Sequence, residues 1–173
     1  MKKAFTLSTF LLSFLFSNAQ STNITAKYLK SLPDSSIIYI AALWCSPCIE
    51  KQNILEDSLL NRKANYYTFY DRMSFSEEKK RKLIKNNKDQ QLLMLDSRYY
   101  DSKGLIQIVS PKKAIKKFYK DLEKENFKIV KEDELWYGDC IIKIGNRITI
   151  ISGSKISKID FVNFILKSVG QNQ

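Results

Sequence analysis

The pattern of apolar and polar residues predicts a strand, a helix and a second strand in succession. Residues 36–43 form a continuous apolar run of strand length, which is typical of a strand buried on both faces. Apolar residues then recur at helical spacing from Pro47 to Leu60, and a proline suits the first turn of a helix. Residues 65–70 are rich in tyrosine and predict the second strand. A strand, a helix and a strand in this order imply parallel pairing with a right-handed crossover.

The middle of the chain predicts shorter elements. Residues 21–32 form an amphipathic lead-in to the first strand, and a charged helix is predicted over 77–87, after a capping box. Residues 91–95 are a short apolar strand candidate. A further helix begins at Ser110-Pro111, and its apolar face is formed by Ala114, Ile115, Phe118, Tyr119 and Leu122.

The last third of the chain predicts a β-hairpin followed by a helix. Residues 140–144 and 147–151 are strand-like and flank Gly145-Asn146, a two-residue linker that favours a hairpin. A final helix starts at about Ser157, with a predicted apolar face of Ile159, Val162, Ile165, Leu166 and Val169. The whole order predicts an α/β fold in which a mixed sheet carries helices on both faces.

The N-terminus has the pattern of a secretory signal. Lys2 and Lys3 precede an apolar stretch at residues 4–16, and small residues lead to Ala19, where we predict cleavage. A single domain then covers residues 20–173, and the protein is expected in the periplasm or outside the cell. The apolar stretch is shorter than the roughly 20 residues that span a membrane, but an uncleaved N-terminal anchor remains the alternative.

The chain is basic, with 29 Lys and Arg against 18 Asp and Glu among 173 residues. Removal of Lys2 and Lys3 lowers the formal charge from +11 to +9. Such a charge can attract acidic partners or an anionic membrane surface, although dispersed lysines are usually only solvated helix faces. Nucleic-acid binding is not favoured, because no recognised nucleic-acid motif accompanies the charge.

Three cysteines carry the candidate chemistry. Cys45 and Cys48 form a C-x-x-C pair and Cys140 stands alone. A bridge between Cys45 and Cys48 closes a very short loop and constrains the unfolded chain little, so disulfide exchange is a better explanation than stability. A zinc ribbon needs a second pair of cysteines, and the chain has no His to serve as a metal ligand, so no metal is expected. The absence of His also excludes Ser-His and Cys-His catalysis.

The position of the pair at the start of a helix suits thiol chemistry. The thiolate is the nucleophile, and a helix N-terminus stabilises it, lowering a thiol pKa from its usual ~8.5. Cys45 is therefore the candidate attacking thiol, and Cys48, three residues on, can resolve the mixed disulfide. Ser46 and Pro47 lie between them, and Pro47 stiffens the turn. Two structural thiols buried in a core remain the alternative.

The segment Trp44-Cys45-Ser46-Pro47-Cys48, placed after an apolar strand and before a helix, resembles the thioredoxin superfamily. In outline the chain is most similar to its periplasmic TlpA/ResA-like oxidoreductases. The resemblance implies a thioredoxin-like three-layer sandwich, extended by a helical insertion at roughly 71–139. It also implies that Trp44 flanks the site and that the redox-active disulfide serves without a separate cofactor.

Two positions depart from the family pattern. The stretch Tyr137-Gly138-Asp139-Cys140 has no proline where the family places a cis-proline, and Tyr39 stands where many relatives have a buried acid. Asp139 is either a proton acceptor near the pair or an exposed turn carboxylate. Cys140 is either a third thiol near the pair or a small buried strand residue. A further set of aromatic residues either lines a partner groove or belongs to the core, namely Tyr99, Tyr100, Trp136 and Tyr137.

The sequence thus predicts thiol-disulfide exchange with exported proteins, and the resemblance implies that the chain acts as a reductase. Its expected partners are exported protein thiols or disulfides and a membrane electron donor. A disulfide oxidase or isomerase is the alternative within the same class, because the sequence does not determine the reduction potential. The two departures from the family pattern favour a third hypothesis, a redox-inert binding module of the same fold.

Overall fold

The structure is a computed structural model that describes residues 22–60, 64–74, 93–101, 110–130, 135–153 and 157–170. The predicted signal segment with its cleavage site and the predicted charged helix over 77–87 lie outside these residues. Within the described residues, the helices are too short or too polar to cross a membrane.

A mixed sheet forms the middle of the molecule. The described residues contribute seven strands in the order β1-β4-β3-β2-β6-β7-β5. Their bounds are β1 Thr22–Ile24, β2 Ser35–Ala41, β3 Asn65–Tyr70, β4 Leu93–Leu95, β5 Lys128–Val130, β6 Cys140–Ile144 and β7 Arg147–Ile151. The central strand β2 pairs in parallel with β3 and antiparallel with β6. The predicted parallel strand pair and the predicted hairpin are both confirmed.

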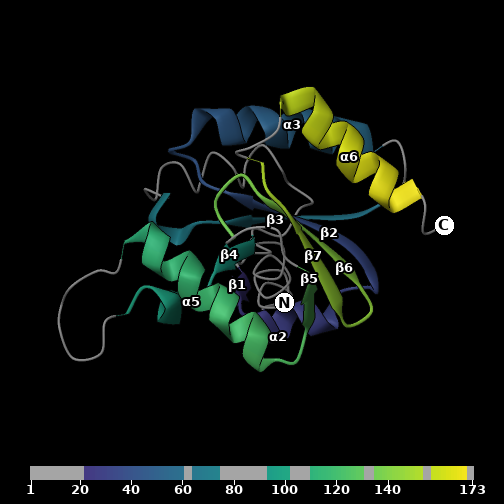
Figure 1. Cartoon of the computed structure of the whole chain (residues 1–173). Coiled ribbons are helices and arrows are strands. Elements are labelled where there is room, and N and C mark those ends of the chain that lie inside the picture. The colour runs from purple at the N-terminus through teal and green to yellow at the C-terminus, as the bar shows by residue number, and fades with distance from the viewer. Residues whose placement is uncertain are drawn as a thin grey trace, which may run out of the picture.

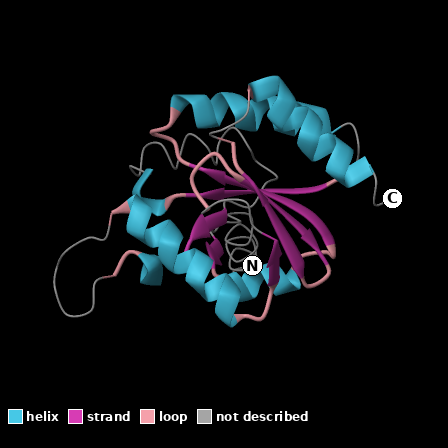
Figure 2. Ribbon diagram, in the orientation of Figure 1, coloured by secondary structure: helices cyan, strands magenta, loops and turns pink. Residues whose placement is uncertain are grey.

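Helices cover both faces of this sheet (Figure 1). The helices α3 (Ser46–Leu60) and α6 (Lys158–Gly170) lie on one face, and α2 (Ala26–Ser31) and α5 (Pro111–Lys124) lie on the other. Two short 3-10 helices, η2 (Arg72–Ser74) and η3 (Ser97–Tyr99), follow strands β3 and β4. Figure 2 shows the resulting three layers of helix, sheet and helix. The predicted α/β three-layer sandwich is confirmed by this arrangement.

The central strand is buried on both faces, as its apolar run predicts. Ile38 and Ile40 pack in the core cluster beneath α2 and α5. Ile37, Tyr39 and Ala41 belong to the cluster beneath α3 and α6. Because strand side chains alternate between faces, one continuous apolar segment supplies both cores.

Three features differ from the sequence prediction. The strands β1 and β5 were not predicted, because each has three residues and only one partner strand, β4 or β7. The predicted inner face of the last helix is wrong at Ile159, which is 70% exposed. Val162 and Ile165 are buried as predicted, and Phe161, which the prediction omitted, is buried beside them with its ring centroid 6.4 Å from that of Tyr39.

Candidate redox site

The turn between β2 and α3 places the cysteine pair at the start of α3. The N–H of Cys45 donates to the carbonyl of Ala42 at 3.0 Å, which ends the extended chain. The carbonyl of Cys45 then accepts from the N–H groups of Cys48 and Ile49 at 3.0 and 3.1 Å, which are the first helical bonds. Cys45 therefore directly precedes the helix, and its sulfur is bonded to that of Cys48 in a disulfide.

The two sulfurs differ in accessibility. Cys45 is half-buried, and the neighbouring Ser46 and Pro47 are exposed. Cys48 is only 5% exposed, because the first turn of α3 directs it toward the core. A partner molecule can therefore reach the disulfide at Cys45, whereas Cys48 is shielded.

Trp44 lies beside the pair and is held by a buried carboxylate that the sequence analysis missed. The residue is 54% exposed, and its indole N–H donates to Asp71 Oδ2 at 3.1 Å. Asp71 follows β3 directly and is fully buried. The phenol of Tyr137 donates to Asp71 Oδ1 at 3.1 Å, and the phenol of Tyr100 donates to the same oxygen. The sequence feature that could have identified Asp71 is its position as an acid directly after β3, the strand that runs parallel to β2.

Asp71 also connects the two chain segments that flank the disulfide. Trp44 belongs to the turn before Cys45, and Tyr137 belongs to the loop before β6. Their rings lie edge to face, with centroids 5.5 Å apart. One carboxylate therefore fixes the positions of both aromatic residues next to the site.

Gly138 brings the main chain against the buried sulfur, at the place where the resemblance implies a cis-proline. Its φ is +89°, and a Cβ added there lies 3.1 Å from Cys48 Sγ. Its N–H donates to the carbonyl of Ile40 at 2.7 Å, which extends the pairing of β6 with β2. The peptide bonds of the described residues are trans. A glycine without a side chain here allows close approach of the backbone to Cys48.

Tyr39 lies under the first turn of α3. Its phenol donates to the carbonyl of Cys48 at 2.7 Å, and its side chain is buried. Burial raises the pKa of Tyr39, and the neighbouring Cys140 and Asp139 raise it further. The residue at the position of the family's buried acid is thus a protonated donor to the main chain.

Asp139 is buried, so its interpretation as an exposed turn carboxylate is wrong. Its oxygens accept from the N–H of Trp136 at 2.6 Å and from the N–H of Gly153 at 2.9 Å. These bonds join the loop before β6 to the chain after β7, and they explain why a charged residue is tolerated here. Lys51 donates to the carbonyl of Gly153, and burial lowers its pKa while Asp139 opposes that shift.

Cys140 is the small buried strand residue that the simpler interpretation expected. It is fully buried in β6 and pairs across the sheet with Tyr39. Burial raises its thiol pKa, and the neighbouring Asp139 raises it further. At neutral pH its thiol is therefore protonated and shielded from solvent.

The candidate groove aromatics lie mostly in the core. Tyr99, Tyr100 and Tyr137 are 2%, 6% and 3% exposed, and only Trp136 of the four is half-buried. The core interpretation is confirmed for the first three.

No family model matches the chain, and no curated protein matches it. Among solved structures, the chain is similar to a thiol:disulfide interchange protein, a thioredoxin family protein from Chlorobium tepidum TLS. The two share 13% sequence identity, the match covers 83% of this chain and 84% of that chain, and the TM-score is 0.41. A likeness at this TM-score and identity assigns neither a family nor an activity to this chain.

Replacement of Asp71 by Asn is expected to destabilise the protein by about 1–3 kcal/mol, because one of its buried donors loses its acceptor. The Trp44 indole and the Tyr137 phenol bind different oxygens of Asp71, and in Asn one of these two positions is an NH2 group, which cannot accept a hydrogen bond. Urea unfolding measures the loss, and Trp fluorescence of the folded variant reports the release of Trp44. Asp101→Asn is the control, because Asp101 is exposed. Equal losses in the two variants contradict this role for Asp71.

Alkaline pH is expected to unfold the protein through its buried tyrosines. Burial raises the pKa of Tyr39, Tyr100 and Tyr137 above the usual 10. Above pH 10 the unfolded chain loses these protons while the folded chain keeps them, so stability falls as pH rises. Each of these tyrosines lowers the free energy of unfolding by about 1.4 kcal/mol for every pH unit above 10, until the pH reaches its pKa in the folded protein. Three groups together therefore exhaust a typical stability of about 5–15 kcal/mol within a few pH units.

Tyrosinate absorbance and far-UV circular dichroism check this expectation. The absorbance of the buried tyrosines should rise together with the loss of helical signal, whereas exposed tyrosines titrate earlier. Titration of every tyrosine near pH 10 with an unchanged dichroism spectrum contradicts it.

Proposed function

We propose that this protein is a thiol-disulfide oxidoreductase that reduces disulfides of exported proteins and is itself reduced by a membrane electron donor. One observation carries the proposal. An accessible cysteine at the start of α3 forms a disulfide with a shielded cysteine one turn further on. This asymmetry gives the two sulfurs different roles in exchange.

The reaction follows from their accessibility. In the reduced protein, the Cys45 thiolate attacks one sulfur of the partner's disulfide, that disulfide breaks, and the other partner sulfur leaves as a thiolate. Cys48 then loses its proton and attacks Cys45 Sγ. The Cys45–Cys48 disulfide forms, and the second partner sulfur is released as a thiolate. Two electrons pass to the partner, and the membrane donor returns two electrons to the protein.

The helix contributes to the first step. The N-terminus of α3 carries partial positive charge, which stabilises a thiolate on Cys45. The rigid turn through Pro47 and the Tyr39 bond to the Cys48 carbonyl hold the second sulfur within reach.

Export rests on the sequence, and the direction of exchange rests on the resemblance to TlpA/ResA-like reductases alone. The segment 1–19 has the charge and apolar pattern of a secretory signal. An exported protein meets an oxidising compartment, where a reductase needs a continuous supply of electrons. The membrane donor in the proposal provides that supply.

A redox titration tests the proposal. The purified protein is equilibrated in dithiothreitol or glutathione buffers, and the reactivity of Cys45 toward an alkylating reagent is followed. We expect a reversible two-electron transition below about −220 mV, the range of cellular reductants. A transition near −120 mV contradicts the reductase direction and indicates an oxidase. Cys48→Ser and Cys140→Ser variants assign the transition to the pair.

The redox-inert binding module is the second candidate, and one observation favours it. Gly138 closes the main chain against Cys48 at the place where the family pattern has its substrate-contacting proline. A Cys45 that stays unreactive at every potential supports this candidate and overturns the oxidoreductase.

A further inference from the structure

The two helical layers carry different charges. In the layer of α2 and α5, α5 has six Lys against Asp121 and Glu123, and α2 adds two Lys without an acid, which gives a formal charge of +6. In the opposite layer, α3 has three acids against Lys51, and α6 has two Lys against Asp160, which gives −1. The basic character of the described helices is therefore concentrated on one side of the sheet.

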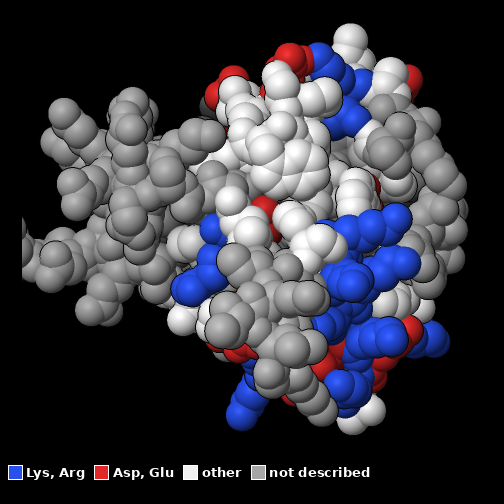
Figure 3. Space-filling view, turned by 90° about the vertical axis from the view of Figure 1, so that its left-hand side faces the viewer, with Lys and Arg blue, Asp and Glu red and all other residues white. Residues whose placement is uncertain are grey.

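Six side chains of α5 form what we call the α5 lysine surface, namely Lys112, Lys113, Lys116, Lys117, Lys120 and Lys124. All are exposed except Lys117, which is half-buried, and the opposite side of the helix packs into the core. Figure 3 shows a large group of Lys and Arg side chains on the lower right of the molecular face, below an area of uncharged side chains. Like charges held so close raise the local potential more than the same number of dispersed lysines.

An aromatic row connects this surface to the disulfide. Lys112 Nζ lies 5.7 Å from the ring centroid of Trp136. The ring of Trp136 lies 5.6 Å from that of Tyr137, which lies 5.5 Å from that of Trp44. Trp44 precedes Cys45 directly. The single phenol proton of Tyr137 is shared between Asp71 Oδ1 and the carbonyl oxygen of Pro111, each 3.1 Å from the phenol oxygen, which ties the start of α5 to the redox site.

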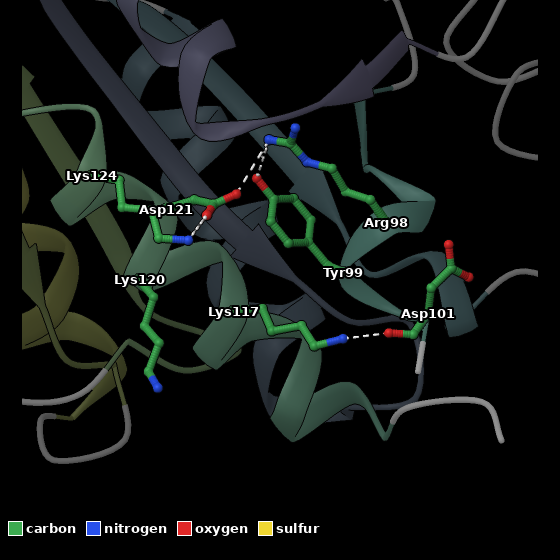
Figure 4. Close-up of a pocket in the computed structure, with 7 residues that line it drawn as sticks. All are labelled: Arg98, Tyr99, Asp101, Lys117, Lys120, Asp121 and Lys124. Carbon is green, nitrogen blue, oxygen red and sulfur yellow. Dashed lines mark hydrogen bonds and ion pairs between the residues drawn. The ribbon is translucent and has the colours of Figure 1, made fainter. Parts of the chain in front are cut away.

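A pocket of about 350 Å³ lies toward the other end of the α5 lysine surface, between α5 and the chain after β4. Asp121 is paired there with Arg98 at 3.3 Å and with Lys124 at 3.1 Å. Figure 4 shows Lys117 directed to the main-chain carbonyl of Asp101, and Lys120 directed away from both carboxylates. Four basic residues and two acids line the pocket, so its net charge is positive.

We propose that the α5 lysine surface is the docking site for an acidic segment of the protein partner whose disulfide reacts at Cys45. The inference rests on the proposed function and names the chemistry of its partner. Acidic side chains bound along α5 place the rest of the segment over the aromatic row and next to the disulfide. The surface acts mainly on the association rate, because charge complementarity steers encounter more than it raises affinity.

The length of α5 limits where the acids of the partner lie. Lys112 and Lys124 are separated by about 18 Å along the helix, at roughly 1.5 Å per residue. An extended segment covers that length with about six residues, at roughly 3.3 Å each. We therefore expect several Asp or Glu residues within about ten residues of the reactive cysteine.

A protein segment fits this surface better than a lipid headgroup layer. The lysines form a row along one helix, and one end of the row continues into the aromatic residues beside Cys45. A row that ends at the reactive sulfur is useful for a chain that carries a disulfide. Binding to an anionic membrane does not require this connection.

The experiment compares the oxidation of the reduced full-length protein by three disulfide peptides that differ only in their flanking Glu, Ser or Lys residues. At low ionic strength, we expect the Glu peptide to react at least about 10-fold faster than the Ser peptide. The difference should largely disappear near 0.5 M salt, where exposed charges are screened. Equal rates for the Glu and Ser peptides at low salt overturn the proposal.

Charge-reversed variants locate the effect. Lys113→Glu with Lys120→Glu should slow the Glu peptide about 10-fold or more and leave a small neutral disulfide reagent unchanged. Arg147→Glu with Lys167→Glu is the matched control. Both residues are exposed and lie outside α5, and the net charge changes by the same amount. Equal slowing in the two double variants overturns the proposal, because net charge alone then explains the rates.

Two further measurements separate the remaining outcomes. If the neutral reagent fails to oxidise Cys45, the proposed function fails, and a Trp fluorescence titration with the Glu peptide then tests the docking surface by itself. Weaker binding to vesicles containing phosphatidylserine in the α5 variant, with unchanged peptide rates, overturns the proposal in favour of a membrane surface.

Discussion

Replacement of Cys48 by Ser is expected to trap the protein in a covalent mixed disulfide with its partner. The accessible Cys45 still attacks the partner disulfide, but the sulfur that releases the partner is missing. Replacement of Cys45 by Ser is expected to lower exchange to the uncatalysed rate, because Cys48 is shielded from a partner. Non-reducing electrophoresis and mass spectrometry of a disulfide peptide incubated with each variant measure both outcomes.

Cys140→Ser is the matched control for these variants. Cys140 is fully buried, and its pKa is raised, so its loss should leave the exchange rate unchanged. Alkylation of Cys140 should likewise require unfolding. Trapping through Cys140, or a rate that falls when Cys140 is lost, contradicts the assignment of chemistry to the Cys45–Cys48 pair alone.

Elements with a strong local pattern were predictable from the sequence. The apolar run of β2 and the Gly-Asn linker between β6 and β7 each specify their own structure, because burial on both faces and a tight hairpin need particular residues. The strands β1 and β5 have three residues each and acquire their conformation by pairing with β4 and β7. No periodicity can be read from so short a segment.

The site was predictable only in part, because many of its contacts join residues that are distant in the sequence. Spacing and context identified Cys45 and Cys48, because the chemistry needs both cysteines within one helical turn. Asp71 was missed because its donors, Trp44, Tyr100 and Tyr137, come from distant parts of the chain. The burial of Asp139 likewise depends on the N–H of Gly153, fourteen residues further on. Contacts of this kind become visible only when the sheet brings the loops together.

Replacement of Gly153 by Ala is expected to cause the largest loss of stability among single substitutions near the site. An added Cβ lies 2.0 Å from the carbonyl oxygen of Gly138 and 2.9 Å from its carbonyl carbon. Both atoms belong to the main chain, so the clash cannot be relieved by a side-chain rotation. We expect a loss of about 3 kcal/mol or more, at the upper end of the range for overpacked sites.

The same clash should change the redox site. Gly138 packs its main chain against Cys48 Sγ, so a displaced Gly138 alters the contacts of the buried sulfur. We therefore expect the reduction potential of the Cys45–Cys48 disulfide to differ from that of the unmodified protein, measured under conditions where the variant is folded. Urea unfolding of the oxidised and reduced forms measures the free energy of unfolding of each form. The difference between the two forms gives the change in reduction potential through a thermodynamic cycle.

Gly145→Ala is the control that separates this clash from a general effect of replacing glycine. Gly145 has a φ of +56°, but an added Cβ there meets no atom within 4 Å. Its expected loss is about 1 kcal/mol, the cost of a left-handed backbone conformation for alanine. The potential should not change, because the hairpin turn lies at the opposite end of β6 from Gly138. A loss at Gly153 as small as that at Gly145 contradicts the close contact between Gly153 and Gly138 beneath the redox site.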